Sequence, residues 1–271
     1  MPQPQPESDP PSGAPDANEE VWRSILLGTN PEYSRNRRMF QRVPGSPRCK
    51  MCAVPFGGVA APLMRAMGRG PWPKNPNYCG RCFTVLNTLH GGAEIDCTLL
   101  FADVRGSTTL AEGMSASQYQ QLMSRFYGAA GRVLVAHDAI VDKFVGDEVV
   151  AIFIPALAQE RHAERAITAA KALLTATGNS PGEKPWLPMG AGVHSGLAYV
   201  GSVGQGAETE LTALCDVVNV AARLASAAGA GEVLVSASAE TAAGIDGGEQ
   251  ERRSLDLRGK SAPVEVVVLH A

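Results

Sequence analysis

Apolar residues from about position 94 onward recur at the spacings of both strands and helices. Residues 98–102 form a short apolar run, which is typical of a buried strand. Residues 115–137 carry apolar side chains at helical spacing, with Ser117 as a candidate N-cap. Two β-rich runs within 139–154 surround Gly146-Asp147, a pair typical of hairpin turns.

The rest of this region continues the alternation. Helices are predicted at 160–174 and 217–228, a strand and turn at 189–200, a strand at 232–236, and two strands within 254–269. Alternating strands and helices with one evident hairpin predict an α/β or α+β domain with a mixed sheet.

The first ninety residues have a different character. Residues 1–20 are rich in Pro and polar residues without apolar periodicity, which predicts a disordered tail. Residues 21–27 predict a short helix, and 45–82 contain many Gly and Pro residues but few regular patterns. We therefore divide the chain into a tail at 1–20, a small module at 21–90 and a larger domain at 91–271.

Composition supports a globular protein, with 45% hydrophobic and 19% charged residues. The longest apolar stretch, 149–158, contains Pro155 and has about half of the roughly twenty residues that a bilayer span needs. The amino terminus lacks the basic-then-apolar pattern of a secretory signal. We therefore expect a cytoplasmic protein without a membrane span.

Charge is unevenly distributed along the chain. Residues 33–82 contain ten Lys or Arg and no Asp or Glu, whereas the residues from 83 onward contain 13 basic and 21 acidic ones. A basic module in front of an acidic domain is compatible with docking between the two, with an anionic partner, or with a solvated surface.

Four of the six cysteines form two C-x-x-C pairs, Cys49 with Cys52 and Cys79 with Cys82. Two such pairs complete a tetrahedral four-sulfur site, so the module is predicted to bind zinc, with an iron–sulfur cluster as the alternative. Two redox-active pairs or loose thiols are the other possibilities. Nucleic-acid contact is permitted by the basic residues but is not expected, because recognition motifs are absent.

Two aspartates occupy positions suited to a hard divalent cation. Asp103 ends the first apolar run, and Asp147 sits at the predicted hairpin tip. Two carboxylates meeting at one point could bridge two ions for an in-line displacement at phosphorus. A solvated turn residue is the alternative for each.

Five segments resemble the successive motifs of the class III nucleotidyl cyclase catalytic domain, in its order and at its separations. They are FADVRGST, DKFVGDEV, GAGVHSG, LTALCDVVNVAARL and LRGKS. The resemblance covers about residues 94–271 and implies a ferredoxin-like α+β domain with a mixed, mainly antiparallel sheet and flanking helices. It also implies conversion of ATP to cyclic AMP and pyrophosphate with two Mg²⁺ or Mn²⁺ ions.

The same resemblance assigns roles to individual residues. Asp103 and Asp147 match the metal-binding aspartates, and Lys143 and Thr212 match the two purine-reading positions. The Lys and Thr pair is similar to the bicarbonate-responsive branch and favours ATP over GTP. Asn219 and Arg223 match the residues that stabilise the transition state. Lys260 matches a lysine that contacts the terminal phosphates.

Family members build this site between two catalytic domains, so the resemblance implies a homodimer with two equivalent sites. Cys215 departs from the family pattern, which has Gly before the following Asp. If the backbone there has positive φ, Cys would be strained.

Three alternatives remain open: a cyclase-like dimerisation or ligand-binding module with little turnover, a redox- or metal-sensing protein acting through the cysteines, and a guanylate cyclase. We expect Cys215 to be an inert buried thiol. We expect His162 to lie on the surface of a helix and His194 at the end of a strand.

Overall fold

The structure is a computed structural model that describes residues 17–45, 47–49, 51–73, 76, 78–89, 91–203, 210–245, 248, 250–260 and 262–271. Most of the predicted tail at 1–20 lies outside the described residues. Its last four residues belong to a helix instead, because α1 spans Ala17–Leu26.

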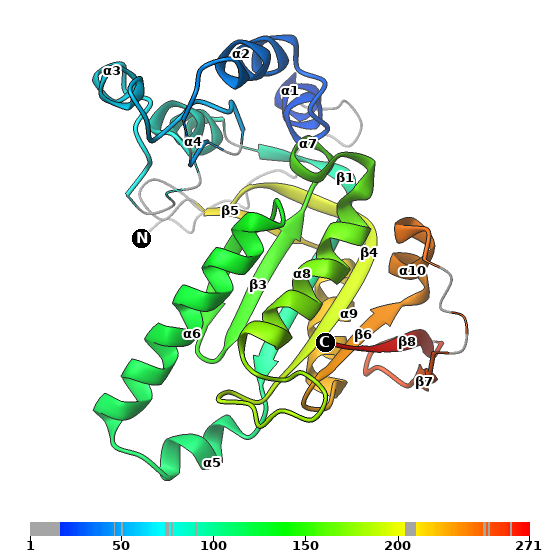
Figure 1. Cartoon of the computed structure of the whole chain (residues 1–271). Helices are drawn as coiled ribbons and strands as arrows, with labels where there is room; N and C mark the ends of the chain where they lie inside the picture. Colours follow the sequence, from blue (N-terminus) through cyan, green and yellow to red (C-terminus); the bar gives the residue numbers. More distant parts are fainter. Residues whose placement is uncertain are drawn as a thin grey trace, which may run out of the picture.

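A single eight-stranded sheet forms the centre of the molecule (Figure 1). Its path runs β2-β3-β1-β4-β6-β8-β7, and β5 pairs with β4 outside this path. Only β4 and β6 pair in parallel among the described strands. The strands are β1 (Gly91–Val104), β2 (Ile140–Val145), β3 (Glu148–Phe153), β4 (Met189–Val203), β5 (Glu210–Leu214), β6 (Glu232–Ser236), β7 (Arg252–Leu255) and β8 (Val264–His270).

Helices cover both faces of the sheet, because alternate strand residues point to opposite sides. On one face Leu100, Ala102 and Val193 pack with residues of α6 (Ala116–Ala136), α8 (His162–Ala176) and α10 (Ala237–Ala243). On the other face Leu99 and Phe101 pack with residues of α1 and α9 (Asp216–Ala227). The predicted mixed, mainly antiparallel sheet with flanking helices is therefore confirmed.

Four helices precede the sheet and lie at the top of the view in Figure 1. They are α1, α2 (Pro31–Gln41), α3 (Ala61–Ala66) and α4 (Gly80–Thr88). A separate small core unites Phe40, Val54, Phe56 and Met64 with the four paired cysteines. Trp22 of α1 is buried in the core of the sheet and donates through Nε1 to the carbonyl of Leu89 at 3.0 Å, which fastens this region to the sheet domain.

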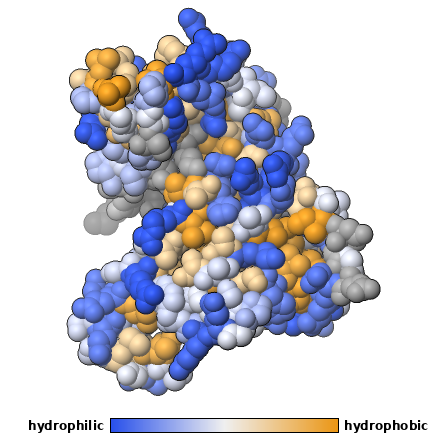
Figure 2. Space-filling view, in the orientation of Figure 1, coloured by the Kyte–Doolittle hydropathy of each residue, from blue (hydrophilic) through white to orange (hydrophobic). Residues whose placement is uncertain are grey.

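Three connecting helices complete the described chain. They are α5 (Ser107–Glu112), α7 (Pro155–Ala158) and the 3₁₀ helix η1 (Gln159–Arg161). None of the described helices is long and apolar enough to span a bilayer. The space-filling view shows apolar surface where α3 lies, and Val59, Leu63 and Met67 are exposed there (Figure 2).

Several elements differ from their predictions. The first strand starts seven residues before position 98, because Ala93, Ile95 and Cys97 alternate with exposed Glu94 and Asp96 and continue the buried face. Helix α6 is capped by Ser115 rather than Ser117: the Ser115 hydroxyl accepts from the Gln118 amide and the Gln118 side chain accepts in return. The predicted strand and turn at 189–200 is one continuous strand, since β4 pairs with the whole length of β1.

Candidate active site and cysteine centre

The two aspartates lie at one end of the sheet because of strand register. Asp103 is opposite Glu148 across the β1–β3 ladder. Asp147 occupies the turn between β2 and β3, where Val145 pairs with Glu148 and Gly146 has φ +61°. A positive φ suits glycine, so the two-residue turn closes without strain and brings Asp147 next to Glu148 and Asp103.

The charges at this end repel one another. Burial is the largest cause of a raised pKa for Asp103, the guanidinium of Arg105 opposes it, and the charge of Asp147 raises it further. Burial together with Asp103 and Asp147 raises the pKa of Glu148 to about 7. Arg105 forms an ion pair with Asp103. Neither Arg105 nor Glu148 was expected at this site from the sequence, although they lie within the motifs FADVRGST and DKFVGDEV.

This arrangement fits a divalent cation. Carboxylate oxygens are the ligands that Mg²⁺ prefers, and Mg²⁺ takes only one or two of them, leaving the other positions to water and phosphate. A bound cation would also offset the repulsion that raises the pKa of Asp103. The two aspartates therefore suit the predicted role.

The two expected purine-reading residues meet at a third side chain. The Thr212 hydroxyl on β5 donates to Oδ2 of Asp142 at 2.8 Å, and Nζ of Lys143 lies 3.8 Å from the same oxygen. The side chain of Asp142 is only 4% exposed. Asp142, which precedes Lys143 in the motif DKFVGDEV, was not expected at this site from the sequence.

The remaining predicted residues are arranged around the start of α9. Asn219 is exposed on this helix, and Arg223 lies one turn further along. Lys260 forms an ion pair with Asp216. The guanidinium of Arg223 lies 3.6 Å from the position that a β-carbon on Gly259 would occupy, so Arg223 borders the turn that carries Lys260.

Cys215 precedes α9 with φ +92° and ψ −179°. This backbone region belongs almost entirely to glycine, so the expected strain at this position is confirmed. The side chain is exposed, which contradicts the expectation of an inert buried thiol.

The two histidines are less peripheral than predicted. His194 lies inside β4 rather than at a strand end, and its Nδ1 lies 2.7 Å from the Ser236 hydroxyl. Burial and the charge of Lys260 lower the pKa of His194 to about 4, against an opposing effect of Asp216. His162 is the first residue of α8 and is half-buried rather than on the surface, with Nδ1 2.8 Å from the Thr98 hydroxyl.

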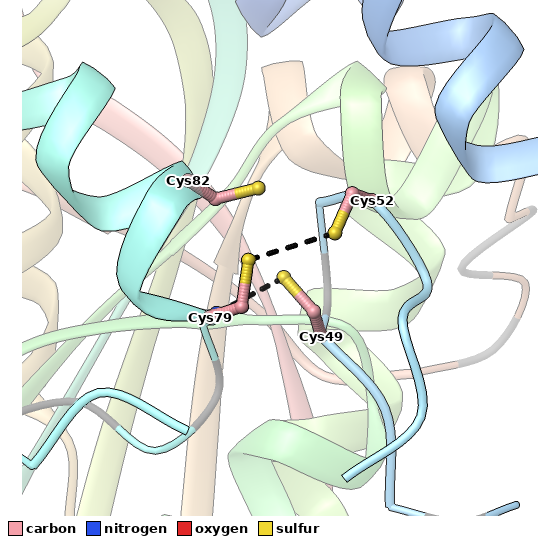
Figure 3. Close-up of side chains that lie close together, drawn as sticks. All are labelled: Cys49, Cys52, Cys79 and Cys82. Carbon is pink, nitrogen blue, oxygen red and sulfur yellow. Dashed lines mark hydrogen bonds between the residues drawn. The ribbon is translucent and has the colours of Figure 1, made fainter. Parts of the chain in front are cut away.

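The four paired cysteines converge on one point, as Figure 3 shows. All four are buried, and their sulfur atoms lie within 4.8 Å of one another. Within the described part of the chain, this is the one group of three or more potential metal ligands that lie this close together. Sγ of Cys52 and Sγ of Cys79 are 3.7 Å apart. A tetrahedral ion with Zn–S bonds of about 2.3 Å places its sulfurs about 3.8 Å apart. The cluster therefore has the dimensions of a four-sulfur metal site.

Neighbouring donors are arranged to support thiolates in this cluster. The Cys79 amide donates to Sγ of Cys49 at 3.2 Å, and Nη1 of Arg69 donates to Sγ of Cys52 at 3.8 Å. Hydrogen bonds among the four thiols lower the pKa of Cys79 and Cys52 and raise the pKa of Cys49 and Cys82, so two of the four are favoured as thiolates. By contrast, burial raises the pKa of the isolated Cys97 thiol to about 12, which keeps it protonated.

A model of the adenylate and guanylate cyclase catalytic domain matches residues 93–270. The chain belongs to this family. Among curated relatives, adenylate cyclase 1 of Rhizobium meliloti is 37% identical over 135 residues, which cover 48% of this chain and 20% of the relative. An uncharacterized protein of Mycobacterium tuberculosis is 30% identical over 182 residues, which cover 66% of this chain and 34% of the relative. The chain thus spans at most about a third of these relatives' length.

Solved cyclase structures agree with the fold. The guanylyl cyclase Cya2 is similar with a TM-score of 0.58 and 27% identity, over 66% of this chain and 93% of that one. The adenylyl cyclase CyaB of P. aeruginosa gives a TM-score of 0.58 and 25% identity, over 66% and 95% of the two chains. Both kinds of cyclase are equally similar in fold, so the fold does not distinguish an adenylyl from a guanylyl cyclase.

The predicted site residues of this cyclase domain fall into separate groups within one chain. Asp103 and Asp147 form the first, Lys143 and Thr212 the second, and Arg223 and Lys260 border the turn at Gly259. Among the described residues, no hydrogen bond or ion pair joins the aspartates to the other two groups.

Proposed function

We propose that this protein is an adenylate cyclase, which converts ATP to 3′,5′-cyclic AMP and pyrophosphate. The observation that carries the proposal is the pairing of Asp103 with Asp147 at one end of a cyclase sheet, in a chain that also carries Lys143 and Thr212. Two Mg²⁺ or Mn²⁺ ions held by the aspartates would polarise the ribose hydroxyl and neutralise charge on the triphosphate.

The other residues bind and orient the nucleotide. Lys143 donates to adenine N1, which is an acceptor, whereas guanine carries a proton there. Thr212 accepts from the adenine amino group. Asn219 orients the ribose, Arg223 stabilises charge on the α-phosphate, and Lys260 binds the terminal phosphates. A guanylate cyclase is the second candidate, because a guanylyl cyclase is as similar in fold as an adenylyl one.

We infer that the active form is a homodimer. Each chain carries the aspartates and the nucleotide-reading residues as separate groups, and C2 symmetry brings each group against the complementary group of the second copy. Leu214 of β5, two residues from Thr212, is an exposed large apolar residue, and so is Leu197 of the paired strand β4, which suits an interface. A monomer should be inactive.

We also propose that the cysteine centre binds one structural Zn²⁺. Support comes from the convergence of the sulfurs and from their role at the centre of a small core. An iron–sulfur cluster uses the same ligands and is the alternative for this site.

The proposed activity is tested by assaying the protein with ATP and GTP in parallel, each with Mg²⁺ and Mn²⁺. We expect cyclic AMP as the main product, and Asp103→Ala should lower the rate by roughly 100-fold or more because metal binding is lost. Asp96→Ala is the matched control, since Asp96 is an exposed aspartate on the same strand and should be neutral. A dimeric protein that forms no cyclic nucleotide under any of these conditions would instead be a cyclase-like binding module.

A further inference from the structure

An irregularity in β2 determines where Asp142 points. The pairing of β2 with β3 shifts register between Val141 and Lys143, so Asp142 is the extra residue of a bulge. In a regular strand the side chains of Asp142 and Lys143 would point to opposite faces. Here Nζ of Lys143 lies 3.8 Å from Oδ2 of Asp142, so the bulge turns both side chains to one region.

Asp142 also reaches a residue 70 positions away in the sequence. The Thr212 hydroxyl donates to the same oxygen, Oδ2, at 2.8 Å. Thr212 is buried, and the Asp142 side chain is 4% exposed, so water does not compete readily for this hydrogen bond. The nearby ammonium of Lys143 stabilises the buried carboxylate, which would otherwise be costly.

The direction of this hydrogen bond limits what Thr212 can offer a ligand. A threonine hydroxyl has one proton, and an ionised carboxylate can only accept. With its proton directed at Asp142, the Thr212 oxygen presents only lone pairs to a base. Such an oxygen accepts from the exocyclic amino group of adenine and repels the carbonyl oxygen that guanine carries at the equivalent position.

We propose that Asp142 is a positioning residue that determines purine specificity by fixing the Thr212 hydroxyl as an acceptor. The inference rests on the proposed function, in which Lys143 and Thr212 face the purine. Asp142 does not touch the nucleotide in this scheme. Its effect on the exocyclic group of the purine passes through the shorter contact, that with Thr212, and this separates a specificity role from a merely structural one.

The test compares Asp142→Ala and Asp142→Asn with wild type, using kcat/KM for ATP and for GTP. In Asp142→Ala the Thr212 hydroxyl is free to rotate and can donate to guanine, so the ATP-to-GTP ratio should fall about tenfold. Asp142→Asn retains an amide oxygen as acceptor and should restore part of the preference. Circular dichroism and thermal unfolding check that each variant is folded.

A double-mutant cycle isolates the path through Thr212. In a Thr212→Ala background, Asp142→Ala should change the ATP-to-GTP ratio far less than in wild type, because no hydroxyl remains to be oriented and only the contact of Asp142 with Lys143 is lost. A ratio that stays at the wild-type value in Asp142→Ala, with both rates reduced alike, would overturn the proposal. The proposal would also be overturned if Asp142→Ala lowered the ATP-to-GTP ratio as much in the Thr212→Ala background as in wild type.

Affinities separate this inference from the proposed function. Binding of fluorescent mant-ATP and mant-GTP, measured for the same variants, reports the purine preference without turnover. If wild type forms no cyclic nucleotide but prefers mant-ATP, and Asp142→Ala removes that preference, the proposed activity fails and the role of Asp142 stands. Equal affinities of wild type for the two nucleotides would refute the role of Asp142.

Discussion

Cys215 occupies a backbone conformation that suits glycine. Its φ of +92° places the β-carbon in a region that costs a non-glycine residue roughly 1–3 kcal/mol. The strain lies immediately before α9, the helix that carries Asn219 and Arg223. The surrounding sheet and helix therefore hold this residue in a conformation that it would not adopt alone.

Replacing Cys215 with glycine should stabilise the protein. Because the side chain is exposed, Cys215→Gly removes the strain without losing buried contacts, and we expect a gain of roughly 1 kcal/mol or more in the free energy of unfolding. Urea unfolding measures the change. Cys215→Ala retains a β-carbon and should give no such gain, and an equal gain in both variants would rule out backbone strain as the cause.

His194 should make the fold sensitive to acid. The pKa of His194 in the folded protein is about 4, against 6.5 for an ordinary histidine, so between these pH values the unfolded chain binds a proton that the folded chain does not. Stability is therefore complete above pH 6.5 and decreases as the pH falls toward 4, by about 3 kcal/mol for this group.

Unfolding measured across this pH range tests the assignment. His194→Gln should flatten the loss of stability, whereas His270→Gln, at an exposed position at the end of β8, should not. His162, whose pKa burial also lowers, adds a smaller loss of the same sign in both variants. An unchanged slope in His194→Gln would show that other groups dominate.

Individual elements differ in how far they could be predicted. The β2–β3 hairpin followed from Gly146-Asp147, and β6 was predicted with its observed bounds, because local chemistry and short apolar runs determine both. Helices α2 and α4 were not predicted, since their buried faces pack on the cysteine core and not on a periodic apolar stripe. The identity of the candidate site residues came from ordered motifs.

The contacts among those residues could not be predicted from sequence. Asp142 meets Thr212 through a strand bulge and a contact between segments 70 residues apart. Glu148 joins the aspartates because the β1–β3 register places it opposite Asp103. Register and bulges are set by tertiary packing, so only the structure reveals them.

The cysteine module should depend on the zinc ion proposed for it. We expect about one zinc ion per chain by elemental analysis, and removal by a strong chelator should unfold the module, because the free energy of binding a structural zinc, roughly 10 kcal/mol or more, is largely free energy of folding. Tryptophan fluorescence reports the change, since Trp72 stacks on Phe83 of α4 with ring centroids 5.1 Å apart.

Variants locate the metal at this centre. Cys79→Ser should lose the ion, whereas Cys215→Ala, an exposed cysteine outside the cluster, should retain it. Full metal content in purified Cys79→Ser would place the ion elsewhere, and iron in place of zinc would favour the cluster alternative.

At the level of the whole molecule, the proposed homodimer makes a quantitative prediction. Asp103→Ala and Arg223→Ala should each be nearly inactive alone. When the two are mixed in equal amounts and allowed to exchange subunits, half of the dimers are mixed, and each mixed dimer has one intact site. Activity should therefore recover to about one quarter of the wild-type value.

The complementation assay needs a control for residual activity. Mixing Asp103→Ala with Asp147→Ala should restore nothing, because both changes disable the same half of the site. Recovery in that mixture, or none in the first, would contradict a site shared between two chains.

Strand β1 runs from the cysteine module to the end of the sheet that carries Asp103. Helix α4 ends at Thr88, β1 begins at Gly91, and Asp103 is the thirteenth of its 14 residues. The strand is about 43 Å long between its terminal α-carbons, and neighbours on both sides hold it in place. It cannot slide by one residue without turning its buried side chains outward. A displacement of the cysteine centre would therefore reach Asp103 only as a displacement of the whole strand, and glycines inserted after Leu89 should uncouple the two ends while leaving each intact.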